Sequence, residues 1–283
     1  MGEALRRRWN QLEAVLRQHK RILVAFSGGC DSTFLLAAAR KTLGKENILA
    51  VTAVSASLAQ RERFEAASLA ALLDAPHQSI ATNELQNSDY RANPSNRCFF
   101  CKDELFRSLS PMAKELQMVL ADGLNASDRL EIRPGIHAAH QWKVRHPLEA
   151  AHLTKRDVRV LSRWLGLRTW NKPASPCLSS RIPYGTAVTP GILRQIEAAE
   201  DVLHREGFPV VRVRHYGEQA RIEVPLRDLE RLQDAMRWLR IVGQLQNAGY
   251  QEVIADPRGF RSGRLNGKEE NRFPDAHAYE KSL

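Results

Sequence analysis

The order of hydrophobic and polar positions divides the first half of the chain into alternating strands and helices. Short apolar runs at Ile22–Phe26 and Ile48–Val54 predict strands that are buried on both faces. Helical periodicity follows directly after the first apolar run, and a second helix is predicted over Glu62–Leu73 after the second run. A further helix is predicted over Lys102–Leu116, and a strand follows at Val119–Asp122. This alternation predicts an α/β fold with a parallel sheet, helices on both faces, and ligands beyond the carboxyl ends of the strands.

The second half begins with a loop and then changes its pattern. The proline-bearing stretch Asn171–Gly185 interrupts all periodicity, which indicates a hinge or an active-site loop. An order of helix, strand, strand, helix and strand follows, at Ile192–Arg205, Val210–His215, Ala220–Val224, Leu226–Leu245 and Glu252–Ala255. We therefore predict one domain over residues 1–170, a smaller α+β domain over 171–266, and a polar tail over 267–283.

Composition narrows the choice of partner and compartment. The chain has 42 basic and 32 acidic side chains, a net charge of +10, which favours anionic partners such as nucleotides, phosphorylated metabolites or RNA. A merely soluble basic surface is the alternative, because the charges are scattered. We find neither a signal-peptide core nor a membrane span and expect a cytoplasmic protein without a membrane partner. Two of the four cysteines form the pair Cys98-x-x-Cys101, which in a reducing compartment indicates metal or redox chemistry.

The hexapeptide SGGCDS lies between the first predicted strand and its helix. Gly28 and Gly29 let the backbone approach an anion, and the N–H groups of the helix end attract its charge. Ser27 and Ser32 add hydroxyl donors, and Asp31 can hold Mg²⁺. No lysine follows the glycines, so this is not the Walker loop that binds β and γ phosphates. A plain glycine turn would explain the two glycines alone.

These residues resemble a known superfamily. The hexapeptide after ILVAF is similar to the pyrophosphate loop of the PP-loop ATP pyrophosphatases, whose members adenylate a substrate and release pyrophosphate. Two further matches are the segment DGLN at Asp122–Asn125 with Asp128, and Pro147-Leu148 followed by Lys155. The resemblance implies the adenine nucleotide alpha hydrolase-like fold, ATP and Mg²⁺ as cofactors, and ATP contacts that include Gly123 and Lys155.

Five longer stretches, TWNKPAS, SSRIPYGT, GFPVVRVR, ARIEVP and GFRSGRLN, resemble the LarE family of ATP-dependent sulfur transferases. The resemblance implies a homo-oligomer, with a hexamer built of trimers as one form. Members of this family convert the carboxylates of pyridinium-3,5-biscarboxylic acid mononucleotide to thiocarboxylates during biosynthesis of the nickel-pincer nucleotide, and the resemblance implies the same activity here. The smaller domain would serve substrate binding and oligomerisation. Substrate binding would involve Ser180, Arg181, Arg212 and Arg214, the last two on one face of a predicted strand.

The cysteines decide the expected sulfur source. One branch of the family sacrifices a loop cysteine and leaves dehydroalanine, and another holds a four-iron, four-sulfur cluster on three cysteines. The sacrificed cysteine falls here at Pro176, one position before Cys177. Cys98 and Cys101 therefore favour the cluster branch, with Cys177 as the third ligand. Sacrificial use of Cys177 stays open, as does simple packing of the cysteine pair with its phenylalanine neighbours.

Charged neighbours add further candidates. Lys172 and Arg181 flank Cys177 and would raise its thiolate fraction. Lys102, next to the cysteine pair, could stabilise charge on the phosphates, and Glu200 is a weaker candidate metal ligand. The catalytic set predicted from the sequence is thus Asp31, Lys102 and Cys177. The plain alternatives are an inert buried cysteine, a solvated lysine and an exposed glutamate.

Three other functions compete with this interpretation. A PP-loop tRNA thiolation enzyme would use the same ATP chemistry, but it should carry a continuous basic track. The sequence has neither a long Lys/Arg tract nor zinc-ribbon cysteine sets, which favours a small-molecule substrate over nucleic acid. An amidating synthetase would not need the three cysteines, and a nucleotide-binding module without activity would not need Asp31 and Lys155.

Overall fold

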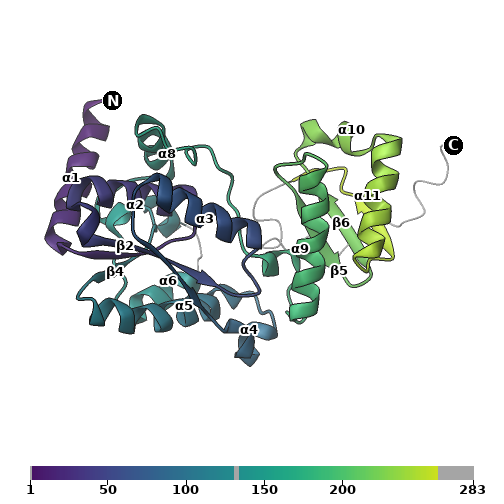
Figure 1. Cartoon of the computed structure of the whole chain (residues 1–283), viewed down its shortest axis with the longest axis horizontal. Helices are drawn as coiled ribbons and strands as arrows, with labels where there is room; N and C mark the ends of the chain where they lie inside the picture. The colour runs from purple at the N-terminus through teal and green to yellow at the C-terminus, as the bar shows by residue number, and fades with distance from the viewer. Residues whose placement is uncertain (1, 131–133, 261–283) are drawn as a thin grey trace. The chain divides into compact units, whose positions relative to one another are not determined.

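The computed structural model describes residues 2–130 and 134–260, which divide into two compact units (Figure 1). The first unit runs to Ser179 and includes Ala187–Leu193, and the second comprises Ser180–Thr186 and the residues from Arg194 onward. The first unit therefore extends past the boundary expected after residue 170. The predicted polar tail at 267–283 lies outside the described residues.

A parallel sheet forms the centre of the first unit. Its strands lie in the order β3-β2-β1-β4, with bounds β1 Ile22–Ala25, β2 Ile48–Val54, β3 His77–Ala81 and β4 Val119–Ala121. This confirms the α/β class and the parallel sheet predicted from the apolar runs. The sequence pattern missed β3, because this edge strand is largely polar and carries exposed side chains, so it has no continuous apolar run.

Helices cover both faces of this sheet (Figure 1). Alternate residues of β1 point to opposite faces: Ile22 and Val24 contact the core under α1, α2, α3 and α8, while Leu23 contacts the core under α5 and α6. The helices of this unit are α1 Glu3–His19, α2 Cys30–Leu43, α3 Gln60–Leu72, α4 Ser88–Arg91, α5 Arg97–Glu115, α6 Pro134–Gln141, α7 Pro147–Ala150 and α8 Lys155–Trp164.

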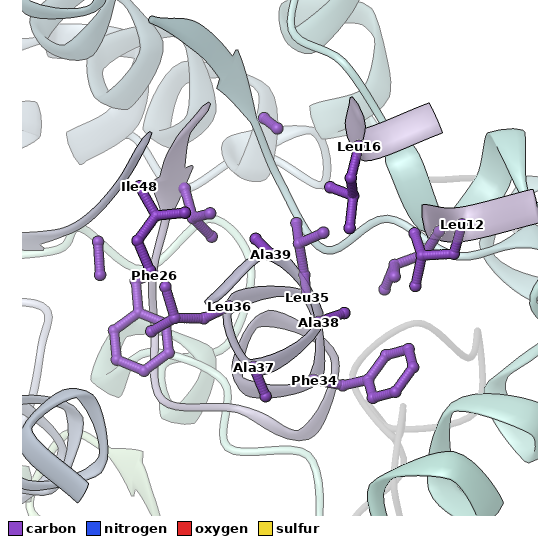
Figure 2. Packing of buried hydrophobic residues seen from close by; sticks show 14 of the residues in the cluster. Leu12, Leu16, Phe26, Phe34, Leu35, Leu36, Ala37, Ala38, Ala39 and Ile48 are labelled. Carbon is purple, nitrogen blue, oxygen red and sulfur yellow. The ribbon is translucent and has the colours of Figure 1, made fainter. Parts of the chain in front are cut away.

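Helix α2, which follows the glycine loop, is buried along most of its length. Its residues from Phe34 to Ala39 are buried, and Leu12 and Leu16 of α1 approach it from one side while Phe26 and Ile48 approach it from the sheet (Figure 2). Removing such apolar surface from water stabilises the contact by about 25 cal/mol per Å². The packing fixes α2 against the sheet and thereby fixes the place where its first turn leaves the glycine loop.

The second unit is a small α+β fold with its own core. Its sheet has the order β5-β6-β7, antiparallel between β5 and β6 and parallel between β6 and β7. The elements are β5 Arg212–Tyr216, β6 Gln219–Glu223, β7 Glu252–Ala255, α10 Leu229–Leu232 and α11 Ala235–Asn247, and α9 Pro190–Arg205 runs into it from the first unit. Phe208, Ile241 and Leu245 are buried in this core.

Most predicted helix bounds shift by one or two residues, and two helices differ by more. The helix expected over Leu226–Leu245 is interrupted after α10, because Asp234 caps a new helix by accepting a hydrogen bond from the Arg237 N–H at 3.0 Å. Helix α5 begins at Arg97 rather than Lys102, so the cysteine pair lies on its first turns. Among the helices of residues 2–130 and 134–260, none is long and apolar enough to cross a membrane.

Candidate active site

The glycine loop between β1 and α2 has the form that an anion-binding loop requires. Gly28 has a φ of +67°, and a Cβ there would lie 3.2 Å from the Ala66 Cα, so only glycine fits without strain. Gly29 occupies the N-cap of α2 and has no side chain that could bond to the first amides of the helix. Those amides and the Ser27 and Ser32 hydroxyls, which lie 3.2 Å apart, can therefore bind phosphate.

The segment after β4 packs directly against the start of α2. A Cβ on Gly123 would lie 2.9 Å from the Ser32 amide nitrogen and 3.0 Å from the carbonyl carbon of Asp31. The Asn125 side chain donates from Nδ2 to Asp31 at 3.3 Å. The Asn125 backbone N–H donates to the Asp128 carboxylate at 3.0 Å. The two sequence motifs, far apart in the chain, thus meet at the carboxyl ends of neighbouring parallel strands.

Lys155 completes this part of the site. It is the first residue of α8, where Thr154 and Asp157 form a capping box, and its ammonium forms an ion pair with Asp31. Its backbone N–H donates to Ser127 Oγ at 3.1 Å. Asp31 and Lys155 therefore lie together at the mouth of the glycine loop, as a Mg²⁺ ligand and a phosphate ligand would have to.

The cysteine pair lies on the first turns of α5. Cys98 is exposed and Cys101 is half-buried. Burial raises the pKa of the Cys101 thiol, the negative charges of Cys177 and Glu84 raise it further, and the charge of Lys102 opposes them. Cys101 and Cys177 are thus close enough to influence each other.

The segment that carries Cys177 is attached to both of these regions. Before the cysteine, Lys172 Nζ donates to the Gly28 carbonyl at 3.3 Å. After it, the Ser179 carbonyl accepts from the buried guanidinium of Arg97, the first residue of α5, at 2.9 Å. The loop predicted from its prolines therefore connects the glycine loop to the helix that carries the cysteine pair.

The two cations that flank Cys177 in the sequence form ion pairs with glutamates, and their expected action on the thiol stays a prediction. Lys172 Nζ lies 3.0 Å from both the Glu62 and the Glu65 carboxylates. Arg181 donates through Nε and Nη2 to Glu200, each at 2.8 Å. Both cations that flank Cys177 in the sequence therefore have carboxylate partners. The sequence pattern could not show this, because the three glutamates lie far from the loop in the chain.

The donor atoms of the described residues limit the kind of metal site that they can form. Within the described ranges, no three His, Cys, Asp or Glu side chains surround a point where a single ion could bind. A four-iron cluster sets a different requirement, because each cysteine binds a different iron atom and the sulfurs are farther apart. Cys98, Cys101 and Cys177 fit this by donor type and by the interaction of their charges. Glu200 accepts hydrogen bonds from Arg181 and the Val213 amide, and its metal role stays a prediction.

Arg212 and Arg214 lie on one face of β5, as their alternation in the sequence predicted. Val213 between them belongs to the core, whereas Arg212 and Arg214 are buried on the other face. Arg214 donates to the Ser180 carbonyl at 2.7 Å and to Glu223 at 3.0 Å. Arg212 lies over the Phe260 ring, 5.3 Å from its centroid. Ser180, Arg181, Arg212 and Arg214 thus form one cluster in the second unit, held partly by glutamates.

The sequence did not single out His146, which stabilises the end of β4. Its Nδ1 lies 2.7 Å from Asp122. Burial by itself would raise the pKa of Asp122, but the hydrogen bond from His146 and the charge of Lys102 outweigh it and hold the pKa below its ordinary value. Lys102, half-buried next to Cys101, therefore acts electrostatically on the strand end that packs against the glycine loop. In the sequence, His146 is marked only by its position directly before Pro147-Leu148, the pair that resembles the PP-loop superfamily.

We expect Asp122→Asn to flatten the acid limb of the stability profile. Because the folded pKa of Asp122 is depressed, its contribution is present above the unfolded value near 3.8 and is lost as the pH falls below it. The variant should lose about 1–3 kcal/mol at pH 7, with the difference shrinking toward pH 3. Thermal unfolding from pH 7 to pH 3 measures this. Asp74→Asn is the matched control, because Asp74 is exposed and salt should remove its effect.

Comparison with known proteins agrees with this geometry. Residues 1–113 match the family model described as a PP-loop domain. A pyridinium-3,5-bisthiocarboxylic acid mononucleotide synthase of Lactiplantibacillus plantarum is 38% identical over 257 residues, which cover 90% of this chain and 92% of the relative. The chain belongs to the LarE family.

Two further relatives extend the LarE comparison. An uncharacterized protein of Synechocystis sp. is 42% identical over 247 residues, 87% of this chain and 92% of the relative. An uncharacterized protein of Methanocaldococcus jannaschii is 23% identical over 246 residues, again 87% of this chain and 92% of the relative. The similarity to the LarE family therefore spans both units.

Proposed function

We propose that the chain is an ATP-dependent sulfur transferase that adenylates the carboxylates of pyridinium-3,5-biscarboxylic acid mononucleotide and converts them to thiocarboxylates. The observation that carries the proposal is the segment around Cys177. It bonds to the glycine loop through Lys172 and to the cysteine helix through Ser179, so a nucleotide site and three thiols belong to one unit. The named L. plantarum relative supports the substrate.

The first step is adenylation. A substrate carboxylate oxygen attacks the α-phosphorus of ATP, the bond to the β-phosphate oxygen breaks, and pyrophosphate leaves. The amides of the glycine loop with Ser27 and Ser32 hold the phosphates. Asp31 would hold Mg²⁺ and Lys155 would bind a phosphate of ATP, which would separate the ion pair between them. Lys102 stabilises negative charge near the end of β4.

The second step transfers sulfur to the acyl carbon and expels AMP. With a four-iron, four-sulfur cluster on Cys98, Cys101 and Cys177, the bound cluster would supply a sulfide as nucleophile. In the sacrificial route, the Cys177 sulfur attacks the acyl-adenylate and forms a thioester. Loss of the Cys177 Cα proton then breaks the Cβ–S bond, releasing the thiocarboxylate and leaving dehydroalanine. The interaction of Cys101 with Cys98 and Cys177, which brings three thiols to one region, favours the cluster route.

The second unit supplies the binding site for the substrate's phosphate. Ser180, Arg181, Arg212 and Arg214 bring three guanidinium groups to a cluster that contains two carboxylates, Glu200 and Glu223, so it keeps an excess of one positive charge. Arginine is well suited to phosphate because its N–H groups match two oxygens at once. A cytoplasmic location and a homo-oligomer, with a hexamer as one form, remain our predictions.

The test combines product analysis with iron analysis. Protein purified without oxygen is incubated with Mg-ATP and the pyridinium dicarboxylate, and we expect AMP, pyrophosphate and a thiocarboxylate product. Formation of ADP, or no turnover by folded protein with its thiols reduced, contradicts the proposal. The cluster route further predicts brown protein whose iron is lost in Cys98→Ala and Cys101→Ala. Iron-free protein that loses the mass of H₂S at Cys177 after one turnover identifies the sacrificial route instead.

A further inference from the structure

Three buried hydroxyl groups meet beside the cysteines. Tyr90 Oη lies 2.7 Å from Ser57 Oγ and 2.7 Å from Ser179 Oγ, and Ser179 Oγ lies 3.2 Å from Ser57 Oγ. All three residues are at most 2% exposed. Each hydroxyl can donate one hydrogen bond and accept another around the triangle, so all three are satisfied without water.

The three hydroxyl groups belong to segments that lie far apart in the sequence. Ser57 follows the central strand β2, and Tyr90 lies on α4, whose first amides are capped by the Asn87 side chain. Ser179 ends the segment that carries Cys177, and the Leu178 amide between them donates to the Ser57 carbonyl at 2.9 Å. The rigid sheet is thus linked to the Cys177 segment through buried hydrogen bonds.

The same region holds the start of α5. Arg97 donates to Asn93 and to the Ser179 carbonyl, and both Arg97 and Asn93 are buried. Cys101 follows one helical turn later. Burial raises the pKa of Tyr90, and the charges of Cys177 and Cys101 raise it further, which places its hydroxyl within electrostatic reach of both thiols.

We propose that Tyr90, with Ser57 and Ser179, is a positioning residue that holds Cys177 in register with Cys101. The inference rests on the proposed use of these cysteines. Tyr90 takes no part in bond making. Its hydroxyl fixes the backbone two residues beyond Cys177, and a thiol in a proline-framed loop would otherwise sample many positions relative to α5.

The test measures the approach of the two thiols directly. In iron-free, reduced, full-length protein carrying Cys98→Ser, dibromobimane becomes fluorescent when it bridges Cys101 to Cys177, and peptide mass spectrometry identifies the bridge. We expect Tyr90→Phe to slow bridging about five-fold, the change that loss of its hydrogen bond to Ser179 produces if that bond has ordinary strength. Tyr250→Phe is the matched control, because it removes a buried hydroxyl in the second unit, 3.3 Å from His215 Nδ1, and should leave bridging unchanged.

A second variant and a second measurement distinguish a failure of the positioning role from a failure of the proposed function. Ser179→Ala removes the smaller hydroxyl and should slow bridging similarly, so unchanged bridging in folded Tyr90→Phe or in Ser179→Ala overturns the inference. Pyrophosphate release should stay within about two-fold in both, since the glycine loop is untouched. Bridging needs neither ATP nor the pyridinium substrate. Slower bridging in a protein that transfers no sulfur would therefore support the positioning role while rejecting the proposed function.

Discussion

Cys177→Ala is expected to abolish thiocarboxylate formation, by at least about 100-fold, while ATP-dependent adenylation continues. Both sulfur routes use this thiol, either as the nucleophile or as the third cluster ligand. The glycine loop, Asp31 and Lys155 do not depend on it, because the contacts of the loop with this segment are made by Lys172. Mass spectrometry of the nucleotide product and a pyrophosphate release assay measure the two steps separately.

The comparison with Cys101→Ala sharpens this prediction. If a cluster supplies the sulfur, both variants should lose iron and sulfur transfer together. If Cys177 is sacrificed, Cys101→Ala should keep most of its single-turnover activity, because Cys101 then contributes only through its packing. Full thiocarboxylate formation by Cys177→Ala would contradict both routes, and loss of pyrophosphate release would show that the variant disturbs the nucleotide site instead.

Gly123→Ala is expected to reduce pyrophosphate release about 100-fold, since a small displacement of a phosphate-binding group has that effect. The added Cβ would lie 2.9 Å from the Ser32 amide nitrogen and 3.0 Å from the Asp31 carbonyl carbon, both backbone atoms that cannot rotate away. The start of α2 has to shift relative to β4. Overpacking of this kind should also lower the free energy of unfolding by about 1–3 kcal/mol. Steady-state kinetics with ATP and chemical denaturation measure the two effects.

Gly243→Ala is the matched control for that change. Gly243 lies inside α11 in the second unit, and a Cβ there would contact nothing within 4 Å. Alanine is favoured over glycine in a helix by up to about 1 kcal/mol, so this variant should be neutral or more stable, with unchanged kinetics. Equal activity of Gly123→Ala and the parent protein would show that the close packing at the strand end is not needed for nucleotide binding.

The sequence was sufficient for the architecture of the first unit because burial dictates its pattern. Ile48–Val54 is apolar at almost every position, as a strand covered on both faces must be, and the structure gives β2 those bounds. Thr154 and Asp157 form the capping box of α8 for a local reason, because both lie within its first turn. The edge strand β3 and the break after α10 were missed, because an edge strand needs few apolar residues and one capping aspartate can end a helical pattern.

The sequence by itself determined the glycine loop, the matching segment after β4 and the cysteines, because each depends on residue types at short spacing. The tertiary structure alone decided how they combine. It paired Asp31 with Lys155, neutralised Lys172 with two glutamates, and gave the buried Tyr90 its two serine partners. These contacts join residues far apart in the chain, and only folding around the buried sheet brings their charges and hydroxyls within bonding distance.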